Sequence, residues 1–506
     1  MNGKRMRRAL MVGLAVWAAL LFALTAAERG TPGAGIKSFW DAAWYSVATL
    51  TTAGYGDLVP VSAAGKWIGV LLMALSVGLW GALIGFLWAA FRDTLLPTWR
   101  LFWVSRHPWW VFSERNEAAE ALAKELLAEH PDSRVIFCGE SAKSGENGMT
   151  GARSVPWDIL SLLQQAPSRK AARTAFLMSE DGWANAAQAT ALVSRCTAVY
   201  SRGEKAVSIP GVRCFDSVSL CARQYWQAHP AGAEETVFLL IGGGAQAQAL
   251  LCEGLLACCR EPFQATVFHV FGDWADFCRL HPDLNTVVFH SEAWNADRAL
   301  LETADRILFA AGDERANAED AAALIRAFPL RGAVHAATSL PVGDVERFGL
   351  ASQIYTGELV MHQALDRLAV ALHRAYGRRT GTETPWETLP PFLQDSNRAA
   401  ADHMLTKIRL LLPGEDIRAT SAEACARAAA RFAALTPQER ENCRRCEHAR
   451  WCLFHTLHNW RYAAERDDRL RLHPCLVPYE QLSADDKAKD DSAWEILGTI
   501  GEEALP

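Results

Sequence analysis

The sequence has no excess of positive charge. Its 51 Lys and Arg residues are outnumbered by 57 Asp and Glu residues, so the formal net charge is −6 over 506 residues. A chain that binds nucleic acid through a basic surface needs the opposite balance, so nucleic acid is not an expected partner. Charged residues make up only 21% and hydrophobic residues 50%, close to a globular average, so a membrane part can occupy only a minority of the chain.

The chain also lacks the pattern of a disulfide framework. It has 13 cysteines, but Cys138, Cys252, Cys258 and Cys259 lie inside apolar patterns typical of strands or helices. Such positions suit the reduced thiols of the cytosol. At roughly 100 to 200 residues per domain, the length predicts three or four domains, with most of the protein in the cytoplasm.

Charge is entirely absent from two long runs, residues 9–27 and 67–91. Each is long enough to cross a bilayer core of about 30 Å as a helix. A cleaved signal peptide is the alternative for the first run, but the second run and the residues between them favour a retained hairpin. Basic residues flank the pair on its outer sides and place both termini in the cytoplasm; they are Lys4, Arg5, Arg7, Arg8, Arg92 and Arg100.

Between these runs, residues 39–51 predict a short re-entrant helix, which needs protein or a water-filled cavity around it at membrane depth. The segment "TTAGYGD" follows. Successive backbone carbonyls can replace the water shell of a potassium ion, and glycine permits the left-handed angles that such a ribbon needs. The segment resembles the selectivity filter of potassium channels; the matching residues are Thr52, Gly54, Tyr55, Gly56 and Asp57, with Ala53 in place of the usual valine.

This resemblance implies that potassium is the permeant ion and that residues 52–56 bind it, namely Thr52, Ala53, Gly54, Tyr55 and Gly56. Asp57, Trp44 and Tyr45 are expected to support the filter. Because one chain supplies a quarter of each coordination ring, the resemblance implies a homotetramer in a lipid bilayer. The alternative is a glycine-rich turn between two ordinary spans, which would not need this pentapeptide after an aromatic half-helix.

Glycines in the second apolar run suggest a gate. Glycine weakens a helix by roughly 0.5 to 1 kcal/mol relative to alanine, and the family's hinge position falls at Ser76, two residues before Gly78. Ser76, Gly78 and Gly81 are therefore the candidate hinge. The alternative is that Gly81 and Gly85 let helices pack closely in lipid.

After a basic and aromatic linker at residues 97–108, apolar strand patterns alternate with helical ones. This alternation predicts parallel sheets covered by helices, in a first Rossmann-like unit at 109–232 and a second at 233–380. The first unit has no glycine triplet after its first strand, so no dinucleotide cradle is expected there.

The second unit does contain a glycine turn, "IGGGAQA". Gly242, Gly244 and Ala247 follow the G-x-G-x-x-G/A pattern, and Asp273 ends the next strand, where it could accept from a ribose hydroxyl. The turn is a candidate nucleotide or dinucleotide site; the alternative is that its glycines serve folding only. A pore followed by such units resembles channels with cytoplasmic RCK domains, regulators of potassium conductance, and two units in each of four chains would form a ring of eight.

The C-terminal part, residues 381–506, resembles the ryanodine-receptor repeat (RyR) domain, a small helical module. The resemblance is carried by "EHARW", "NWRYAAERDD", "HPCLVPYEQL" and "KAKD" between residues 447 and 490, although Asn459 and Ala463 replace the family's usual glycines. Aromatic and charged side chains could stack on a base and hold a phosphate there. The candidate site residues are Trp451, Trp460, Tyr462, His473, Tyr479, Lys487 and Asp490; the alternative is that the aromatic residues form the module's core.

The C-terminal cysteines and histidines and the glycine turn also allow functions other than a channel. Cys443, Cys446, His448, Cys452, His455 and His458 lie close together, but ligands spread around one helix rarely close a zinc tetrahedron, so no metal site is expected. No constellation of catalytic residues is present, so the protein is not expected to be an enzyme. The glycine turn leaves a membrane-anchored NAD-dependent oxidoreductase as one alternative, and a receptor with a non-conducting hairpin is another.

The sequence thus predicts a multidomain protein with an α-helical membrane pore at 1–96, two α/β Rossmann-like domains and a small α-helical RyR-like domain. Its predicted function is a ligand-gated potassium-selective channel of the bacterial inner membrane. A nucleotide-type ligand is predicted to be read by the RyR-like module, with a dinucleotide at the glycine turn as the second candidate.

Overall fold

A computed structural model describes residues 3–51, 53–91, 95–104, 107–139, 149–165, 173–203, 209–282, 284, 286–382 and 384–500. Thr52 of the expected filter and the flanking residue Arg92 therefore lie outside the described residues. The chain divides into two compact units, one centred on residues 1–106 and one on the remainder. Each unit is described by itself.

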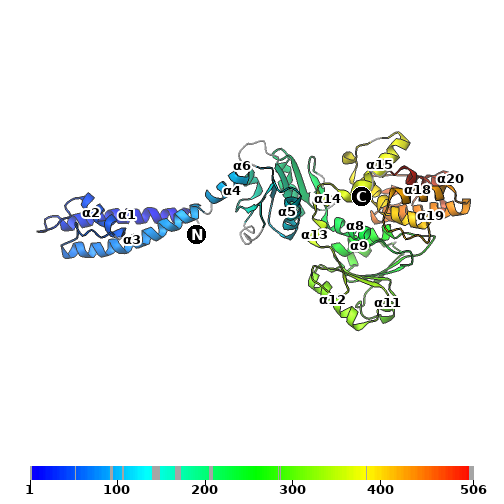
Figure 1. The fold of residues 1–506 in the computed structure, drawn as a ribbon, viewed down its shortest axis with the longest axis horizontal. Helices are drawn as coiled ribbons and strands as arrows, with labels where there is room; N and C mark the ends of the chain where they lie inside the picture. Colours follow the sequence, from blue (N-terminus) through cyan, green and yellow to red (C-terminus); the bar gives the residue numbers. More distant parts are fainter. Residues whose placement is uncertain are drawn as a thin grey trace. The chain divides into compact units, whose positions relative to one another are not determined.

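The first unit consists of helices (Figure 1). Helix α2 begins after Ser38, whose hydroxyl accepts from the Asp41 N–H while the Asp41 carboxylate accepts from the Ser38 N–H. Helix α3 begins after Ser62, whose hydroxyl accepts from Gly65 N, so it starts earlier than the apolar run that predicted it. The helices are α1 (Gly3–Glu28), α2 (Phe39–Leu50), α3 (Ala63–Ala90) and α4 (Leu96–Val104).

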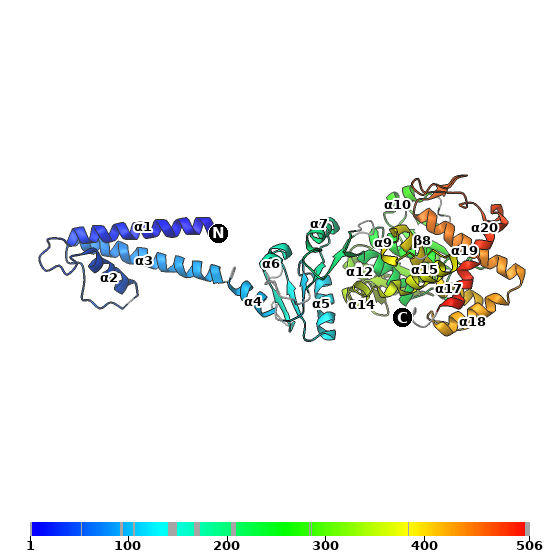
Figure 2. The same cartoon turned by 90° about the horizontal axis from the view of Figure 1, so that it is seen from above.

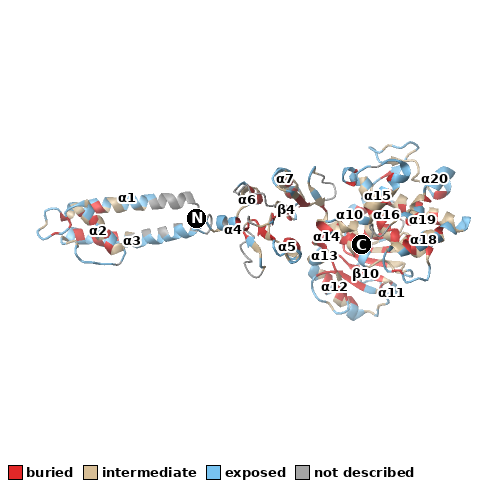
Figure 3. Cartoon of the chain, turned by 45° about the horizontal axis from the view of Figure 1, so that its top comes forward, coloured by how far each residue is buried: buried red, intermediate tan, exposed pale blue. Residues whose placement is uncertain are grey.

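Helices α1 and α3 run alongside each other (Figures 1 and 2). Together with α2 they enclose only a small core, made by Leu21, Leu24, Ile36, Ala42 and Leu72. Most of the remaining apolar surface is exposed (Figure 3), for example Phe22 at 63% and Val77 at 76%. So large an apolar surface needs lipid or another subunit against it. Within the described residues, Met11–Glu28 is long and apolar enough to cross a membrane.

The second unit contains two six-stranded sheets with the orders β3-β2-β1-β4-β5-β6 and β9-β8-β7-β10-β11-β12. Each follows the order 3-2-1-4-5-6 that is typical of Rossmann folds, and the pairings between the central strands are parallel. The prediction of two Rossmann-like α/β domains is thereby confirmed. The strands of the first sheet are β1 (Trp109–Phe112), β2 (Arg134–Phe137), β3 (Ala152–Ser154), β4 (Arg173–Leu177), β5 (Ala198–Arg202) and β6 (Arg213–Phe215).

The second sheet contains β7 (Val237–Ile241), β8 (Val267–Phe271), β9 (Val287–His290), β10 (Arg306–Phe309), β11 (Ala333–Ala337) and β12 (Glu346–Phe348). The sequence patterns identified the central strands and missed β3, β6, β9 and β12. These four are short and lie at the ends of the sheet orders, so they bury little apolar surface and leave no clear periodicity. The helices between strands are α5 (Glu117–Glu129), α6 (Ile159–Gln165), α7 (Gly182–Leu192), α9 (Ala245–Ala257), α10 (Ala275–Leu280), α11 (Arg298–Thr303) and α12 (Glu314–Ala327).

The two α/β parts exchange helices. Helix α8 (Ser217–Ala228), which follows the first sheet, packs on α9 of the second part, and Trp226 Nε1 donates to Leu250 O at 2.8 Å. In return α13 (Ala351–Ile354) and α14 (Gly357–Val360) follow the second sheet and pack on α5, where Gly357 N donates to Glu125 Oε2 at 2.9 Å. One hydrophobic core therefore runs through both parts.

The C-terminal part is helical apart from a two-residue strand pair. Its core is formed by side chains such as Met404, Ile408, Phe432 and Trp494. The elements are η3 (Ala364–Asp366), α15 (Arg367–Thr380), η4 (Trp386–Thr388), α16 (Pro391–Asp402), α17 (Met404–Leu411), α18 (Ala422–Ala433), α19 (Pro437–Leu457), β13 (Arg461–Tyr462), β14 (Leu472–His473), η5 (Tyr479–Gln481), α20 (Ala484–Lys489), α21 (Ser492–Glu495) and η6 (Ile496–Thr499).

Candidate pore and ligand sites

The backbone of the filter segment adopts the left-handed conformation at both glycines. Gly54 has φ +57° and Gly56 has φ +71°, angles that residues with a Cβ adopt at a cost. An added Cβ at Gly54 would meet nothing within 4 Å, so the backbone angle and not the space requires glycine. The N–H of Gly54 donates to Ala48 O at 3.1 Å, which ties the ribbon to the end of α2.

Trp44 connects α2 to the outer half of the filter. Its Nε1 donates to Asp57 Oδ2 at 3.0 Å, and its ring stacks on Tyr55 with centroids 5.8 Å apart and planes 10° apart. The structure thus brings together two of the three expected support residues and the filter tyrosine. Tyr45, the third, lies against α3 instead: a Cβ on Gly69 would stand 2.9 Å from its hydroxyl.

Glu28, at the end of α1, was not identified from the sequence. Its side chain is buried and accepts from Val61 N and Ser62 N, both at 3.0 Å, and from Ser62 Oγ at 2.7 Å. A Cβ at Gly65 would overlap the Glu28 carboxylate, so any other residue there would have to displace this side chain. The carboxylate stabilises the free N–H groups that precede α3. The only sequence signal for this contact was a single acidic residue at the end of an apolar run, because Ser62 and Gly65 lie far along the chain.

The candidate hinge lies within one continuous helix, α3. A Cβ on Gly78 or Gly81 would meet nothing within 4 Å of this chain, in contrast to Gly65 and Gly69. These glycines are therefore not required by packing inside the subunit, and both bending and contact with a neighbouring subunit are compatible with them. The backbone of Ser76 lies in α3, but its side chain is outside the described residues.

The glycine turn has two glycines that serve packing and one that does not. Gly242 has φ +138°, and a Cβ there would stand 2.6 Å from the backbone of Ala310. A Cβ on Gly243 would stand 2.4 Å from Asp273 O. At Gly244, the N-cap of α9, a Cβ would meet nothing within 4 Å and φ is −82°. Neither strain nor packing explains this third glycine.

A phosphate fits this turn chemically, because α9 starts without a side-chain cap and its first N–H groups carry partial positive charge. Ala247 is buried behind the turn, the role expected of the third small residue. Asp273 is exposed and its Oδ1 accepts from Ala275 N at 3.3 Å, which leaves its other oxygen available to a ribose hydroxyl. The residues present therefore fit a nucleotide with its phosphate at Gly244.

The aromatic candidates in the RyR-like part fall into two groups. In the first, Trp451 lies among histidines, with its ring centroid 3.9 Å from His455 and 4.8 Å from His473. Trp460 is only 7% exposed and stacks on Phe392 at 5.1 Å, so its ring is occupied by the protein itself. Tyr462 is 59% exposed and pairs in register with His473 through β13 and β14.

The second group surrounds Tyr479, which is 6% exposed. Lys487 Nζ lies 4.9 Å and the Arg445 guanidinium 4.8 Å from the centre of its ring. The ring of His448 stands edge-on at 5.8 Å, and His448 Nδ1 lies 4.0 Å from Asp490 Oδ2. The structure thus gathers Tyr479, Lys487 and Asp490 and adds Arg445 and His448.

A buried ionic cluster lies behind this second group. Glu447 is bound by Lys407 Nζ at 2.7 Å and by Arg450 Nη2 at 2.5 Å. Burial opposes ionisation of Glu447, but Arg450 and Lys407 together hold its pKa well below the usual range. The sequence resemblance included Glu447 but gave no sign of its partners, because Lys407 comes from α17. Among the described residues, no group of three or more His, Cys, Asp and Glu side chains could hold a metal ion.

Comparison with known families agrees with both ends of the chain. Residues 9–93 match the family model described as an ion channel, and residues 436–501 match the RyR domain. Both resemblances noted in the sequence are confirmed by these matches.

Curated relatives match a short part of the chain. The voltage-gated potassium channel of Aeropyrum pernix is 40% identical over 75 residues, which is 15% of this chain and 25% of the relative. The calcium-gated potassium channel TvoK of Thermoplasma volcanium is 41% identical over 56 residues, which is 11% of this chain and 16% of the relative. The chain therefore spans a quarter or less of the length of these relatives.

Among solved structures, the GsuK channel aligns over 71% of this chain and 100% of its own, with 15% identity and a TM-score of 0.38. A structure described as the GsuK channel bound to NAD aligns over 72% of this chain and 84% of its own, with 14% identity and a TM-score of 0.35. This likeness is too distant to place a ligand in the chain.

Proposed function

We propose that this chain is one subunit of a potassium-selective channel whose pore is opened or closed by a cytoplasmic sensing ring that reads a nucleotide-type ligand. The observation that carries the proposal is the filter segment: a ribbon with left-handed angles at Gly54 and Gly56, held to α2 by the bond from Trp44 to Asp57. The curated relatives that match 56 to 75 residues of the chain are potassium channels.

In the proposed pore the backbone carbonyls of Thr52, Ala53, Gly54 and Tyr55 replace the water shell of the permeant potassium ion. One chain supplies one side of this path, so four chains assemble around it as a homotetramer. The exposed apolar surface of α1 and α3 supports an environment of lipid and neighbouring subunits. The pore comprises residues 1–96 of a bacterial inner-membrane protein with both termini in the cytoplasm.

The sensing part comprises the linker at 97–108, the α/β units at 109–232 and 233–380, and the RyR-like part at 381–506. Helix α9 supports the idea that these parts respond together, because one of its ends lies at the glycine turn and the other contacts the RyR-like part. It starts at the glycine turn, and at its other end Ala257 O accepts from Thr406 Oγ1 and Cys259 O from His403 Nε2, both at 2.7 Å. A ligand at either end of α9 can therefore bias the other.

An oxidoreductase would need a reacting centre next to the glycine turn. The residues of the turn support binding of a nucleotide, and the curated relatives that match the chain are potassium channels. Channel function is therefore the better supported proposal.

The test is the reversal potential of the purified chain in planar bilayers with potassium on one side and sodium on the other. A shift toward the potassium equilibrium potential is expected, and equal permeability of the two ions would refute selectivity. Ala53→Val should raise the ratio of potassium to sodium permeability, because the larger side chain packs behind the filter and holds its carbonyls more firmly. Ala64→Val, at an exposed position near the start of α3 and away from the filter, is the control.

A further inference from the structure

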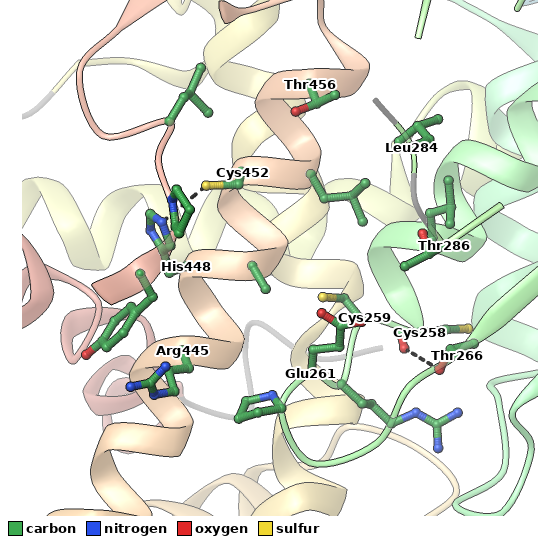
Figure 4. A pocket seen from close by; sticks show the side chains of 18 of the residues that line it. Cys258, Cys259, Glu261, Thr266, Leu284, Thr286, Arg445, His448, Cys452 and Thr456 are labelled. Carbon is green, nitrogen blue, oxygen red and sulfur yellow. Dashed lines mark hydrogen bonds between the residues drawn. The ribbon is translucent and has the colours of Figure 1, made fainter. Parts of the chain in front are cut away.

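A cavity of about 850 Å³ lies between the second α/β part and the RyR-like helices. One wall is formed by the end of α9, the loop after it and β8; the other is formed by α19 and the segment before η5 (Figure 4). Sites for small molecules span roughly 300 to 1,000 Å³. No residue of the glycine turn lines this cavity, so it is a separate candidate site.

The walls are largely apolar. Leu255 and Phe268 come from the α/β side, and Leu453 and Val477 come from the RyR-like side. Pro262 and Pro478 add rigid surface. Small-molecule sites combine such walls with a few placed polar groups, and a flat ring would bury its faces well here.

The cavity contains two arginines that differ in availability. Arg260 already donates to the carbonyls of Gly232, Ala233 and Glu235, so it serves the loop. Among the described residues, Arg445 is paired with Glu480, whose side chain is 63% exposed, and its guanidinium also lies over the Tyr479 ring. An ion pair at a surface contributes little to stability. The guanidinium of Arg445 can therefore exchange Glu480 for an incoming anion.

Tyr479 supplies a second group at the same end. It is buried, and its hydroxyl lies within reach of the Glu441 carboxylate. Burial and the nearby Glu441 carboxylate raise the pKa of this phenol, so it stays protonated and can donate. A buried donor beside the cations of Arg445 and Lys487 suits a phosphate oxygen, which accepts hydrogen bonds and carries negative charge.

The opposite end offers neutral polar groups. Thr456 lies on α19 eleven residues beyond Arg445, about 16 Å along the helix axis, and Thr286 faces it from the other wall (Figure 4). Hydroxyl groups at this end suit the edge of a base.

We propose that this cavity binds a nucleotide, with its phosphate at Arg445 and Tyr479 and its base between the apolar walls. The inference rests on the proposed nucleotide-type signal and assigns it to a site at the RyR-like module other than the one around Trp451 and Trp460. Because the two walls belong to different parts of the chain, the occupant holds the RyR-like helices against α9.

The test is calorimetric titration of the full-length protein in detergent with AMP, GMP, their 3′,5′-cyclic forms, ATP and NAD. For the nucleotide that binds, Arg445→Gln should weaken binding at least tenfold and Arg445→Lys by much less. Ala449→Phe, which fills the cavity from α19, should abolish binding. The matched controls are Arg469→Gln and Ala488→Phe, at exposed positions of the same module that do not line the cavity; both should bind as the parent does.

Unchanged affinity in both Arg445→Gln and Ala449→Phe would overturn the assignment, as would failure of every nucleotide to bind. Loss of binding in Gly244→Asp with retention in Ala449→Phe would place the ligand at the glycine turn instead. Gel filtration of each variant shows whether it still assembles. Potassium flux in vesicles from the same preparations keeps the two proposals separate: flux without binding refutes the cavity alone, and binding without flux refutes the pore alone.

Discussion

Trp44 links the re-entrant helix to the filter through both its ring and its N–H group. The stack on Tyr55 and the bond to Asp57 Oδ2 hold two positions of the filter at once. A hydrogen bond to a charged group contributes roughly 1.5 to 3 kcal/mol, a large share of the energy that could keep a short ribbon in place. The width of the filter is therefore expected to depend on this side chain.

Trp44→Phe keeps an aromatic ring and removes the donor. We expect a severalfold lower ratio of potassium to sodium permeability, because the outer carbonyls are held less firmly. Reversal potentials in mixed ions measure this ratio. Trp40→Phe, at an exposed position of the same helix, is the control. An unchanged ratio in Trp44→Phe would show that the bond to Asp57 does not shape the filter.

The Asp490 carboxyl group lies next to a hydrogen-bond acceptor on His448 and not next to a donor. His448 Nε2 donates to Val477 O at 2.9 Å, so in the neutral ring Nδ1 carries the lone pair that points toward Asp490 Oδ2, 4.0 Å away. Burial, with a further contribution from Glu447, raises the pKa of Asp490 from 3.8 to about 7, against the opposing effects of Arg450 and Lys407. The folded protein therefore holds this proton more tightly than the unfolded chain does.

The stabilisation of the folded state by the proton on Asp490 is complete below about pH 4 and is lost as the pH rises through about 7. Asp490→Asn removes the titration and keeps the neutral shape. We expect it to raise the melting temperature at pH 8.5 by several degrees, corresponding to at most about 4 kcal/mol, and to change it little at pH 4. Asp485→Asn, at an exposed position of α20, is the control. Equal melting of the variant and the parent at pH 8.5 would contradict this expectation.

At the scale of elements, the contact of α1 with the start of α3 depends on Gly65. The Glu28 carboxylate occupies the place where a Cβ would stand, and it accepts from two backbone N–H groups before α3. Gly65→Ala should displace this carboxylate. The loss of charged hydrogen bonds should cost about 2 kcal/mol or more, seen as a lower melting temperature of the assembled protein.

Gly78→Ala is the matched control, since it lies in the same helix and a Cβ there meets nothing within 4 Å. Its helix propensity improves by up to about 1 kcal/mol, so thermal stability should stay or rise. If Gly78 is the hinge, the same variant should open less often in single-channel records. A stable Gly65→Ala protein would show that Glu28 is not needed where the structure places it.

At the scale of the whole molecule, the RyR-like part is joined to the second α/β part by buried contacts at the end of α9, including those from Thr406 and His403. A ligand shifts a gate only to the extent that it prefers one state. The proposed ring must therefore change shape on binding, and α9 is the element that contacts both candidate ligand sites.

Deletion of residues 109–506 should leave a pore that conducts potassium and no longer responds to any nucleotide. Single-channel open probability with and without the nucleotide identified by titration measures the effect. The full-length protein carrying Ala488→Phe serves as the responsive control. A truncated pore that still responds would place the sensor outside the cytoplasmic part.

Much of the fold could be predicted from local pattern. The uncharged runs, the Gly-Tyr-Gly segment and the alternation of strands and helices follow from hydrophobic burial and backbone angles, which act over a few residues and leave a periodic trace. The central strands β1, β4, β7 and β8 were found for this reason. The short strands β3, β6, β9 and β12 were not, because their place in the sheet comes from their neighbours.

What the sequence by itself determined is the chemistry available: a filter segment with glycines at its left-handed positions, a glycine turn before α9, and an aromatic and charged C-terminal module. Tertiary structure alone decided how these groups are used. It showed that Gly242 and Gly243 are required by the backbones of Ala310 and Asp273, and that Trp460 is occupied by Phe392. It also paired Glu28 with Ser62. Such contacts join residues far apart in the chain, so no local pattern records them.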